Sequence, residues 1–226
     1  MKSLLVPCVV CCAGLLLPAL AYGAAAAIGD EDLRVYLGAL ELGARLDVDL
    51  TGDGRAELVY VATDSDERVL GVIDGRGDPA HLGAHLLGEA QLAATPQSSV
   101  SLGFDNGQLL VEQFAGEGIV SVSSYRYRYD AAVQKLQLVE LAVEQYDDAA
   151  GQGTLRISWD LDAGEQVVVR SEPATLDNGQ QVYVYGPELR SIRLAAPIYL
   201  SGTPDPLALL EFEGRREMLV SSDRKH

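Results

Sequence analysis

The sequence predicts an all-β protein built from antiparallel hairpins in a small propeller-like or sandwich arrangement, with one short N-terminal helix. Roughly ten short apolar or alternating segments follow one another, with turn-forming residues about every 8–12 positions, which is typical of antiparallel sheets. Asn106-Gly107 separates two such segments, and Asn-Gly readily adopts the positive φ angles of a two-residue hairpin turn. Residues 154–161 alternate between apolar and other side chains, as expected of a half-buried strand.

The N-terminal helix is expected between Asp30 and Gly43, within an N-terminal segment of residues 22–45. Three acidic residues begin this stretch, and carboxylates in the first turn interact favourably with the positive end of the helix dipole. Residues 79–94 are the other departure from the strand pattern, and their sequence allows either a helix or a long loop. We expect residues 46–226 to form a single all-β domain.

The predicted strands are the apolar runs between turn signals. Asp, Ser, Asn and Gly residues mark these turns, as at 64–66, 162–164 and 177–179. In chain order the predicted strands are residues 57–63, 68–74, 98–104, 108–114, 118–130, 133–146, 154–161, 165–171, 181–186, 189–194 and 207–212, and the last could extend through 217–220.

Residues 1–21 have the pattern of a cleaved secretory signal, with a basic residue at position 2, an apolar core over 4–20 and an A-x-A cleavage site at 19–21. A membrane anchor is the alternative, but the apolar core is short and Pro18 interrupts it. All three cysteines lie within this segment, so the mature chain would have no disulfide and no thiol ligand. The sequence therefore predicts a periplasmic or secreted protein with no membrane span after cleavage.

The chain is strongly acidic. Its 33 acidic and 17 basic residues give a formal charge of −16 at pH 7. Nucleic-acid binding needs a cationic surface, so this balance argues against a nucleic-acid partner, and equally against anionic lipid. It favours a cation or a basic protein as the ligand.

The run from Asp49 to Glu57 places oxygen side chains at alternate positions, then a glycine, then a carboxylate. Ca²⁺ takes six to eight oxygen ligands, and Gly54 permits the tight turn that would gather them around one ion. An EF-hand does not fit, because its twelfth position would be Tyr60 or Leu58 rather than a bidentate Glu. The alternative to a calcium loop is a solvated Asp/Gly turn between two strands.

This run resembles the calcium loop of FG-GAP and VCBS-type repeats, which has the form Asp-x-Asp/Asn-x-Asp-Gly-x-x-Asp before an apolar strand. The resemblance implies four side-chain ligands and one backbone carbonyl, supplied by Asp49, Thr51, Asp53 and Glu57 and by Arg55 respectively. Thr51 and Glu57 depart from the family pattern, and the weaker Thr ligand implies weaker binding, for which the nearby Asp47 could compensate. Because only one clear copy of the loop is present, a seven-bladed propeller is not implied.

Tyr125, Tyr127 and Tyr129 alternate with two arginines in one predicted strand, so the three rings share one face. Aromatic alternation is what a half-buried strand needs, which favours a structural role for these tyrosines. The alternative is an exposed aromatic surface that binds a partner, because Tyr and Arg are frequent in interface hot spots.

Few catalytic groups are present. The chain has no Gly-x-Ser-x-Gly motif and no phosphate-binding glycine loop, and its one close pair of histidines, His81 and His85, has Gly83 between them, which weakens a helical zinc site. We therefore expect a binding protein rather than an enzyme.

The order of the calcium-type loop, the tyrosine-rich strand and the strand and turn at 154–164 is similar to that of periplasmic FG-GAP-like proteins, which include immunity proteins and inhibitors of lysozyme-like peptidoglycan hydrolases. The resemblance implies a periplasmic Ca²⁺-binding protein that binds and inhibits such a hydrolase, whose basic surface would attract an acidic chain. The Ser-Gly-x-x-Tyr loop of some lysozyme inhibitors is not matched, since residues 201–205 lack the tyrosine. The alternative is a calcium-stabilised structural or adhesive envelope module without inhibitory activity.

Overall fold

The structure is a computed structural model that describes residues 28–76, 79–94, 98–116, 119–147, 153–192 and 196–212. The predicted signal at 1–21 and the predicted strand extension at 217–220 lie outside these residues.

Antiparallel strands make up most of the described chain, as predicted. They are β1 (Glu41–Val48), β2 (Glu57–Thr63), β3 (Arg68–Ile73), β4 (Leu86–Gln91), β5 (Ser99–Asp105), β6 (Gln108–Ala115), β7 (Ile119–Asp130), β8 (Lys135–Asp147), β9 (Leu155–Asp160), β10 (Glu165–Thr175), β11 (Gln181–Tyr185) and β12 (Leu189–Ile192). The helical elements are α1 (Asp30–Leu37), the 3₁₀ segments η1 (Pro79–His85) and η2 (Leu200–Gly202), and a C-terminal helix at 206–212.

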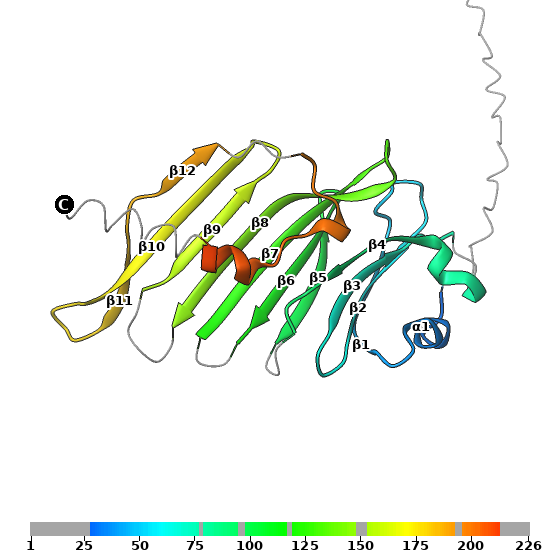
Figure 1. Cartoon of the computed structure of the whole chain (residues 1–226), viewed down its shortest axis with the longest axis horizontal. Coiled ribbons are helices and arrows are strands. Elements are labelled where there is room, and N and C mark those ends of the chain that lie inside the picture. Colours follow the sequence, from blue (N-terminus) through cyan, green and yellow to red (C-terminus); the bar gives the residue numbers. More distant parts are fainter. Residues whose placement is uncertain are drawn as a thin grey trace, which may run out of the picture.

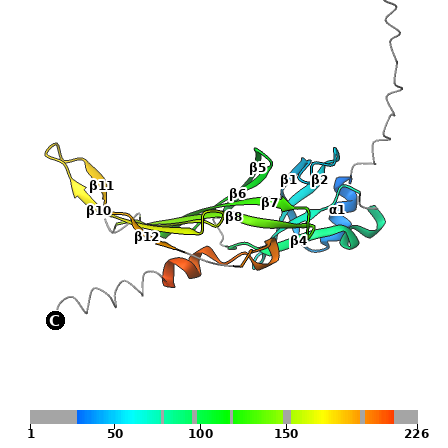
Figure 2. The ribbon, with the colours of Figure 1, turned by 90° about the horizontal axis from the view of Figure 1, so that it is seen from above.

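The strands form two sheets. A four-stranded sheet has the order β1-β2-β3-β4, and an eight-stranded sheet has the order β11-β10-β9-β8-β7-β6-β5, with β12 paired to β10. The four-stranded sheet lies at the β5 end of the eight-stranded sheet (Figure 1), and the β10–β11 hairpin bends away from the plane of the larger sheet at the other end (Figure 2). The sheets do not close into a propeller, so that part of the prediction is wrong.

Local turn chemistry explains why most strand boundaries agree with the prediction. At the β5–β6 hairpin, Asn106 has a φ of +52° and Gly107 a φ of +77°, which are the angles of the predicted two-residue turn. The predicted N-terminal helix is present but shorter than expected. It ends at Leu37 because Gly38, with a φ of +66°, turns the chain out of the helix and into β1.

Three segments differ in type from the prediction. Residues 41–48 form β1, although 41–43 were expected in the helix and no strand was predicted at 44–48. Residues 79–94, expected as a helix or a long loop, divide into η1 and the strand β4, which pairs with β3. Residues 207–212, expected as a strand, belong to the C-terminal helix at 206–212. This helix begins after Asp205, whose Oδ1 accepts a hydrogen bond from the backbone nitrogen of Leu207 at 2.9 Å, and Pro206 suits its first turn.

The main core lies where three apolar surfaces meet. One face of the four-stranded sheet, one face of the eight-stranded sheet and the C-terminal segment at 196–212 contribute to a single cluster of buried side chains. That segment, orange to red in Figure 1, crosses the eight-stranded sheet and lies on one side of it (Figure 2). The backbone nitrogen of Leu138 donates to the carbonyl of Ile198 at 2.8 Å, and Leu200 is buried in the cluster.

A second, smaller cluster covers the other face of the four-stranded sheet. Leu33 and Leu37 of α1 pack there with Leu58 and Tyr60 of β2. Because both faces of β2 and β3 are covered, all six residues of β3 are buried, and the sequence of β2 is a nearly continuous apolar run.

Tyr125 and Tyr127 belong to the main core and are only 1% and 0% exposed. Their rings stack with centroids 6.3 Å apart, and the Tyr127 hydroxyl shares a 2.9 Å hydrogen bond with Thr203 Oγ1. Tyr129 packs against the same cluster and is partly buried. The suggestion that these three rings form an exposed partner-binding surface is therefore wrong for Tyr125 and Tyr127, because the eight-stranded sheet uses this face for its core.

Truncation of a core side chain should destabilise the protein far more than the same truncation at an exposed position. We expect Leu138→Ala, at a residue that is 0% exposed, to lower the free energy of unfolding by about 2–5 kcal/mol, because the change leaves a cavity. Leu189→Ala, at a residue that is 55% exposed, should change it by no more than about 0.5 kcal/mol. Urea denaturation measures both values, and equal losses would contradict this description of the core.

Candidate metal centre

The predicted metal loop is the connection between β1 and β2. Val48 and Glu57 are the last residue pair of this two-stranded ladder, so residues 49–56 form the hairpin turn. Gly54 has a φ of +85°, as the sharp turn predicted at this position requires. Leu50 is buried in the main core and fixes one side of the turn.

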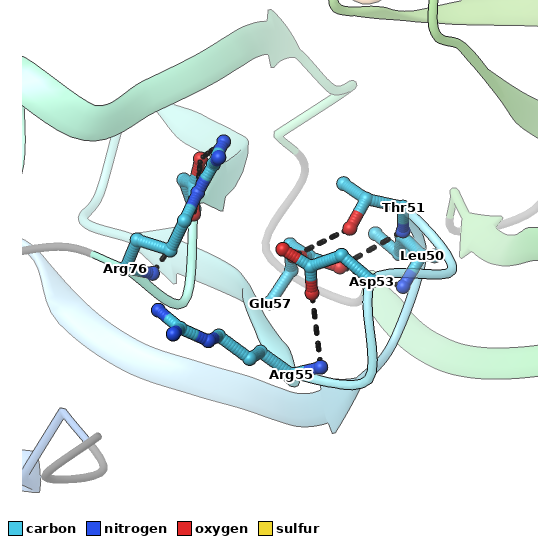
Figure 3. A network of polar contacts seen from close by, with 7 residues as sticks. Leu50, Thr51, Asp53, Arg55, Glu57 and Arg76 are labelled. Atoms are coloured by element: carbon cyan, nitrogen blue, oxygen red, sulfur yellow. Dashed lines mark hydrogen bonds and ion pairs between the residues drawn. The ribbon is translucent and has the colours of Figure 1, made fainter. Parts of the chain in front are cut away.

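Asp49 organises the first half of this loop. Its Oδ1 accepts hydrogen bonds from the backbone nitrogens of Gly52 at 2.7 Å and Asp53 at 3.1 Å, and its Oδ2 accepts one from Gly54 at 2.9 Å. The turn therefore wraps around the Asp49 carboxylate, which brings the side chain of Asp53 to the same side of the loop as Glu57 (Figure 3).

Glu57 closes the loop from the first position of β2, and it is only 1% exposed. Its Oε2 accepts hydrogen bonds from the backbone nitrogens of Leu50 at 2.6 Å and Thr51 at 3.1 Å, and its Oε1 accepts one from the Thr51 hydroxyl at 3.2 Å (Figure 3). Burial raises the pKa of Glu57 because desolvation disfavours the charged form, and the hydrogen bonds from Thr51 and Leu50 act in the opposite direction. The nearby carboxylate of Asp53 raises the pKa of Glu57 further.

Carboxylate oxygens of Asp49, Asp53 and Glu57 lie within 4.8 Å of one another. A hard cation with oxygen ligands at about 2.0–2.6 Å can contact two oxygens that are up to about 5 Å apart. The three carboxylates, which we call the acidic triad, therefore fit one divalent ion. All of their donor atoms are oxygen, which favours a hard cation over a soft one.

The remaining predicted ligands divide into two groups. Thr51 lies beside the triad, because its hydroxyl donates to Glu57. The backbone nitrogen of Arg55 donates to Asp53 Oδ1 at 2.9 Å, so Arg55 also contacts a residue of the triad. Asp47 lies outside the triad. Its two oxygens each accept a 2.8 Å hydrogen bond from the guanidinium of Arg45. Asp47 therefore forms an ion pair with Arg45 and does not act as the additional metal ligand that was expected to compensate for Thr51.

An ion pair that the sequence did not indicate flanks the loop. Arg76 Nε donates to both carboxylate oxygens of Asp74 at 2.9 Å, and its Nη2 makes a further short contact to Oδ2. Figure 3 shows Arg76 beside the loop, and the hydrogen bonds and charge of Asp74 raise the pKa of Arg76, with a smaller contribution from the charge of Asp53. The guanidinium of Arg76 thus balances part of the negative charge next to the triad. The sequence carries one signal of this ion pair, an Asp and an Arg two residues apart in a turn, and this signal is recognised only once the structure is known.

The histidine pair does not form a metal site within the described residues. The backbone of His81 is non-helical, with a φ of −139°, so η1 is kinked at His81 and does not present the two histidines on one helix face. Neither belongs to a cluster of metal-ligating side chains in this part of the chain.

Comparison of the chain with protein-family models, curated proteins and solved structures gives no match. Among the described residues, no helix has both the length and the apolar character needed to cross a membrane.

The Asp74–Arg76 pair predicts a specific dependence of stability on pH. The hydrogen bonds from Arg76 hold the pKa of Asp74 below its ordinary value of 3.8, so its ionised form is stabilised by folding. We expect Asp74→Asn to be less stable than the wild type at neutral pH. The difference should stay constant above the ordinary carboxyl pKa and shrink as the pH falls through the lowered pKa of the folded state.

Urea denaturation of both proteins between pH 7 and pH 2 measures this difference. Arg76→Ala, which removes the other half of the pair, should show the same convergence with the wild type at low pH. A difference that does not change with pH would mean that Asp74 acts through packing rather than charge.

Proposed function

We propose that this protein is an exported Ca²⁺-binding protein that captures a basic protein, a lysozyme-like peptidoglycan hydrolase, and inhibits it. The acidic triad in the β1–β2 turn is the observation that carries the proposal, because it supports the loop on which the family resemblance rests. The predicted export signal, the formal charge of −16 and the paucity of catalytic motifs in the sequence agree with an acidic binding protein outside the cytoplasm.

Calcium is the ion that this loop would suit best. The acidic triad, the Thr51 hydroxyl and the Arg55 carbonyl would supply five oxygens, and water would complete a shell of six to eight. Magnesium demands a near-ideal octahedron and keeps most of its own water, which fits a short loop with mixed side-chain and carbonyl ligands less well. In this proposal the ion acts structurally, because it would neutralise two carboxylates of the turn and the carboxylate at the first residue of β2.

The surface proposed to bind the partner lies at the opposite end of the molecule. We call it the free-edge patch, and it consists of Tyr183, Val184, Tyr185, Leu189 and Ile192. These side chains are 42–84% exposed, and β12 pairs only with β10 among the described strands, so its outer edge has unpaired backbone groups. An exposed edge with apolar side chains favours binding of another chain. The net charge of the protein would attract a basic partner and speed its association.

Calcium should stabilise the protein through the acidic triad. We expect Ca²⁺ to raise the melting temperature, by an amount equivalent to about 2.7 kcal/mol at a free concentration one hundred times the dissociation constant. Asp53→Asn, at an exposed residue, should reduce this rise because it removes one charged ligand.

Asp64→Asn is the matched control for this experiment. Asp64 is also an exposed aspartate in a turn, the one between β2 and β3. Its Oδ1 accepts 2.8 Å hydrogen bonds from the backbone nitrogens of Asp66 and Glu67, but it lies outside the triad. It should retain the full response to calcium. A melting temperature that is the same in calcium and in a chelator would contradict the calcium assignment.

Binding of a hydrolase tests the proposed function itself. We expect the exported form to protect peptidoglycan from a cognate basic hydrolase and the complex to weaken as salt is added. Ile192→Asp should weaken the complex at least about tenfold, because a charge would enter the apolar contact. Val35→Asp, in α1 and 77% exposed, is the control and should leave affinity unchanged.

If a panel of host and neighbouring-gene hydrolases fails to bind at low ionic strength, the inhibitory function is wrong. Calcium stabilisation would then support the alternative, a structural or adhesive module of the cell envelope.

A further inference from the structure

A pocket of about 360 Å³ lies at the β4 edge of the four-stranded sheet, and residues of α1, β2, β3, β4 and η2 contribute to its lining. This volume is within the range of small-molecule sites, roughly 300–1,000 Å³. The pocket is separate from the acidic triad, and neither the calcium loop nor the free-edge patch explains its chemistry.

Glu89 of β4 is the central polar group of this pocket. The hydroxyl of Tyr60 donates to Glu89 Oε1 at 2.5 Å, and the hydroxyl of Tyr36 donates to the same oxygen at 3.4 Å. Both tyrosine pKa values are raised, mainly by burial and further by the charge of Glu89, so the two phenols remain donors. Both bonds go to Oε1, so neither tyrosine occupies Oε2.

The sheet is built so that Tyr60 can reach Glu89. Tyr60, Gly71 and Glu89 are directly opposite one another on β2, β3 and β4. A Cβ atom at Gly71 would lie 2.1 Å from Cζ of Tyr60, so the tyrosine ring occupies the space above the glycine and carries its hydroxyl across β3 to the next strand. The ring of Tyr36, in T-shaped contact at 6.2 Å, holds Tyr60 from the α1 side.

The charge in this pocket is one-sided. A second carboxylate, Glu67, lines it and accepts a 2.7 Å hydrogen bond from the side-chain amide of Gln91. None of the described residues that line the pocket is a lysine, an arginine or a histidine. Two carboxylates without a neighbouring cation favour a positively charged ligand, and Leu37 and Val69 provide apolar surface beside them.

We propose that this pocket binds an organic cation with an aliphatic stem, such as an alkylammonium or the side chain of lysine or arginine. The charged head pairs with Glu89 and Glu67, and the stem lies against the apolar wall formed by α1 and β3. The two tyrosines position Glu89 by holding one of its oxygens, which leaves the other for the ligand.

Isothermal titration calorimetry with the full exported chain tests the proposal. The probes are n-butylammonium, its neutral analogue n-butanol, and Nα-acetyl-lysine amide, whose charged side chain represents a lysine within a polypeptide. Both cations should bind and the alcohol should bind at least about tenfold more weakly, since it lacks the charge. Binding of butylammonium alone would identify a free amine as the ligand, and binding of both would extend the site to a basic side chain.

Glu89→Gln keeps an acceptor for the two tyrosines but removes the charge, and it should weaken the cations about tenfold or more. Glu67 is exposed, so Glu67→Gln leaves the core intact. This variant provides a second measurement of cation affinity if Glu89→Gln fails to fold. Glu112→Gln, an exposed carboxylate on β6, is the matched control and should bind like the wild type. Equal binding of the alcohol and the amine, or full cation affinity in both pocket variants, would overturn the proposal. Asp53→Asn should not change the result, which separates this site from the calcium loop.

Discussion

The apolar face of the eight-stranded sheet must be covered, and the way it is covered determines much of the fold. An antiparallel sheet of this size has one face rich in large side chains, here including Tyr125, Tyr127 and Trp159, which water would solvate poorly. The four-stranded sheet covers part of that face, and the segment at 196–212 returns across the rest. The bonds from Leu138 to Ile198 and from Tyr127 to Thr203 fix this return, so the C-terminal segment completes the core of strands that precede it by about 60 residues or more.

The four-stranded sheet has a different physical character, because both of its faces are covered. Its central strands are buried almost completely, and buried polar side chains there need hydrogen-bond partners. Glu57 is stabilised by two backbone nitrogens and a hydroxyl at one end of β2, and the hydroxyl of Tyr60 finds Glu89 two strands away. The candidate metal centre and the pocket beside Glu89 thus both arise from the same constraint, since a buried strand must satisfy each polar side chain that it carries.

The charge distribution links these sites to the proposed function. The protein carries a formal charge of −16, and several arginines of the described residues pair with neighbouring acids, as in Arg45 with Asp47, Arg76 with Asp74 and Arg128 with Asp162. Such pairs are worth little where they are exposed, but they leave the excess negative charge available for ligands. At the far end of the molecule, the free-edge patch exposes apolar side chains, and β12 has no partner strand besides β10 among the described residues.

The sequence by itself determined the antiparallel β class, most strand boundaries and the loop that holds the triad, because these follow from local properties: alternation, Asn-Gly turns and the spacing of oxygen side chains. Only the tertiary structure decided what lies on each strand face. It buried Tyr125 and Tyr127, made 86–91 the strand β4 and made 206–212 helical, because each outcome depends on a partner distant in the chain or on which surface remains to be covered. The sequence did not predict the pocket beside Glu89, for the same reason. Tyr36, Tyr60 and Glu89 lie up to 53 residues apart, and only the register that places Gly71 between the last two brings their polar atoms together.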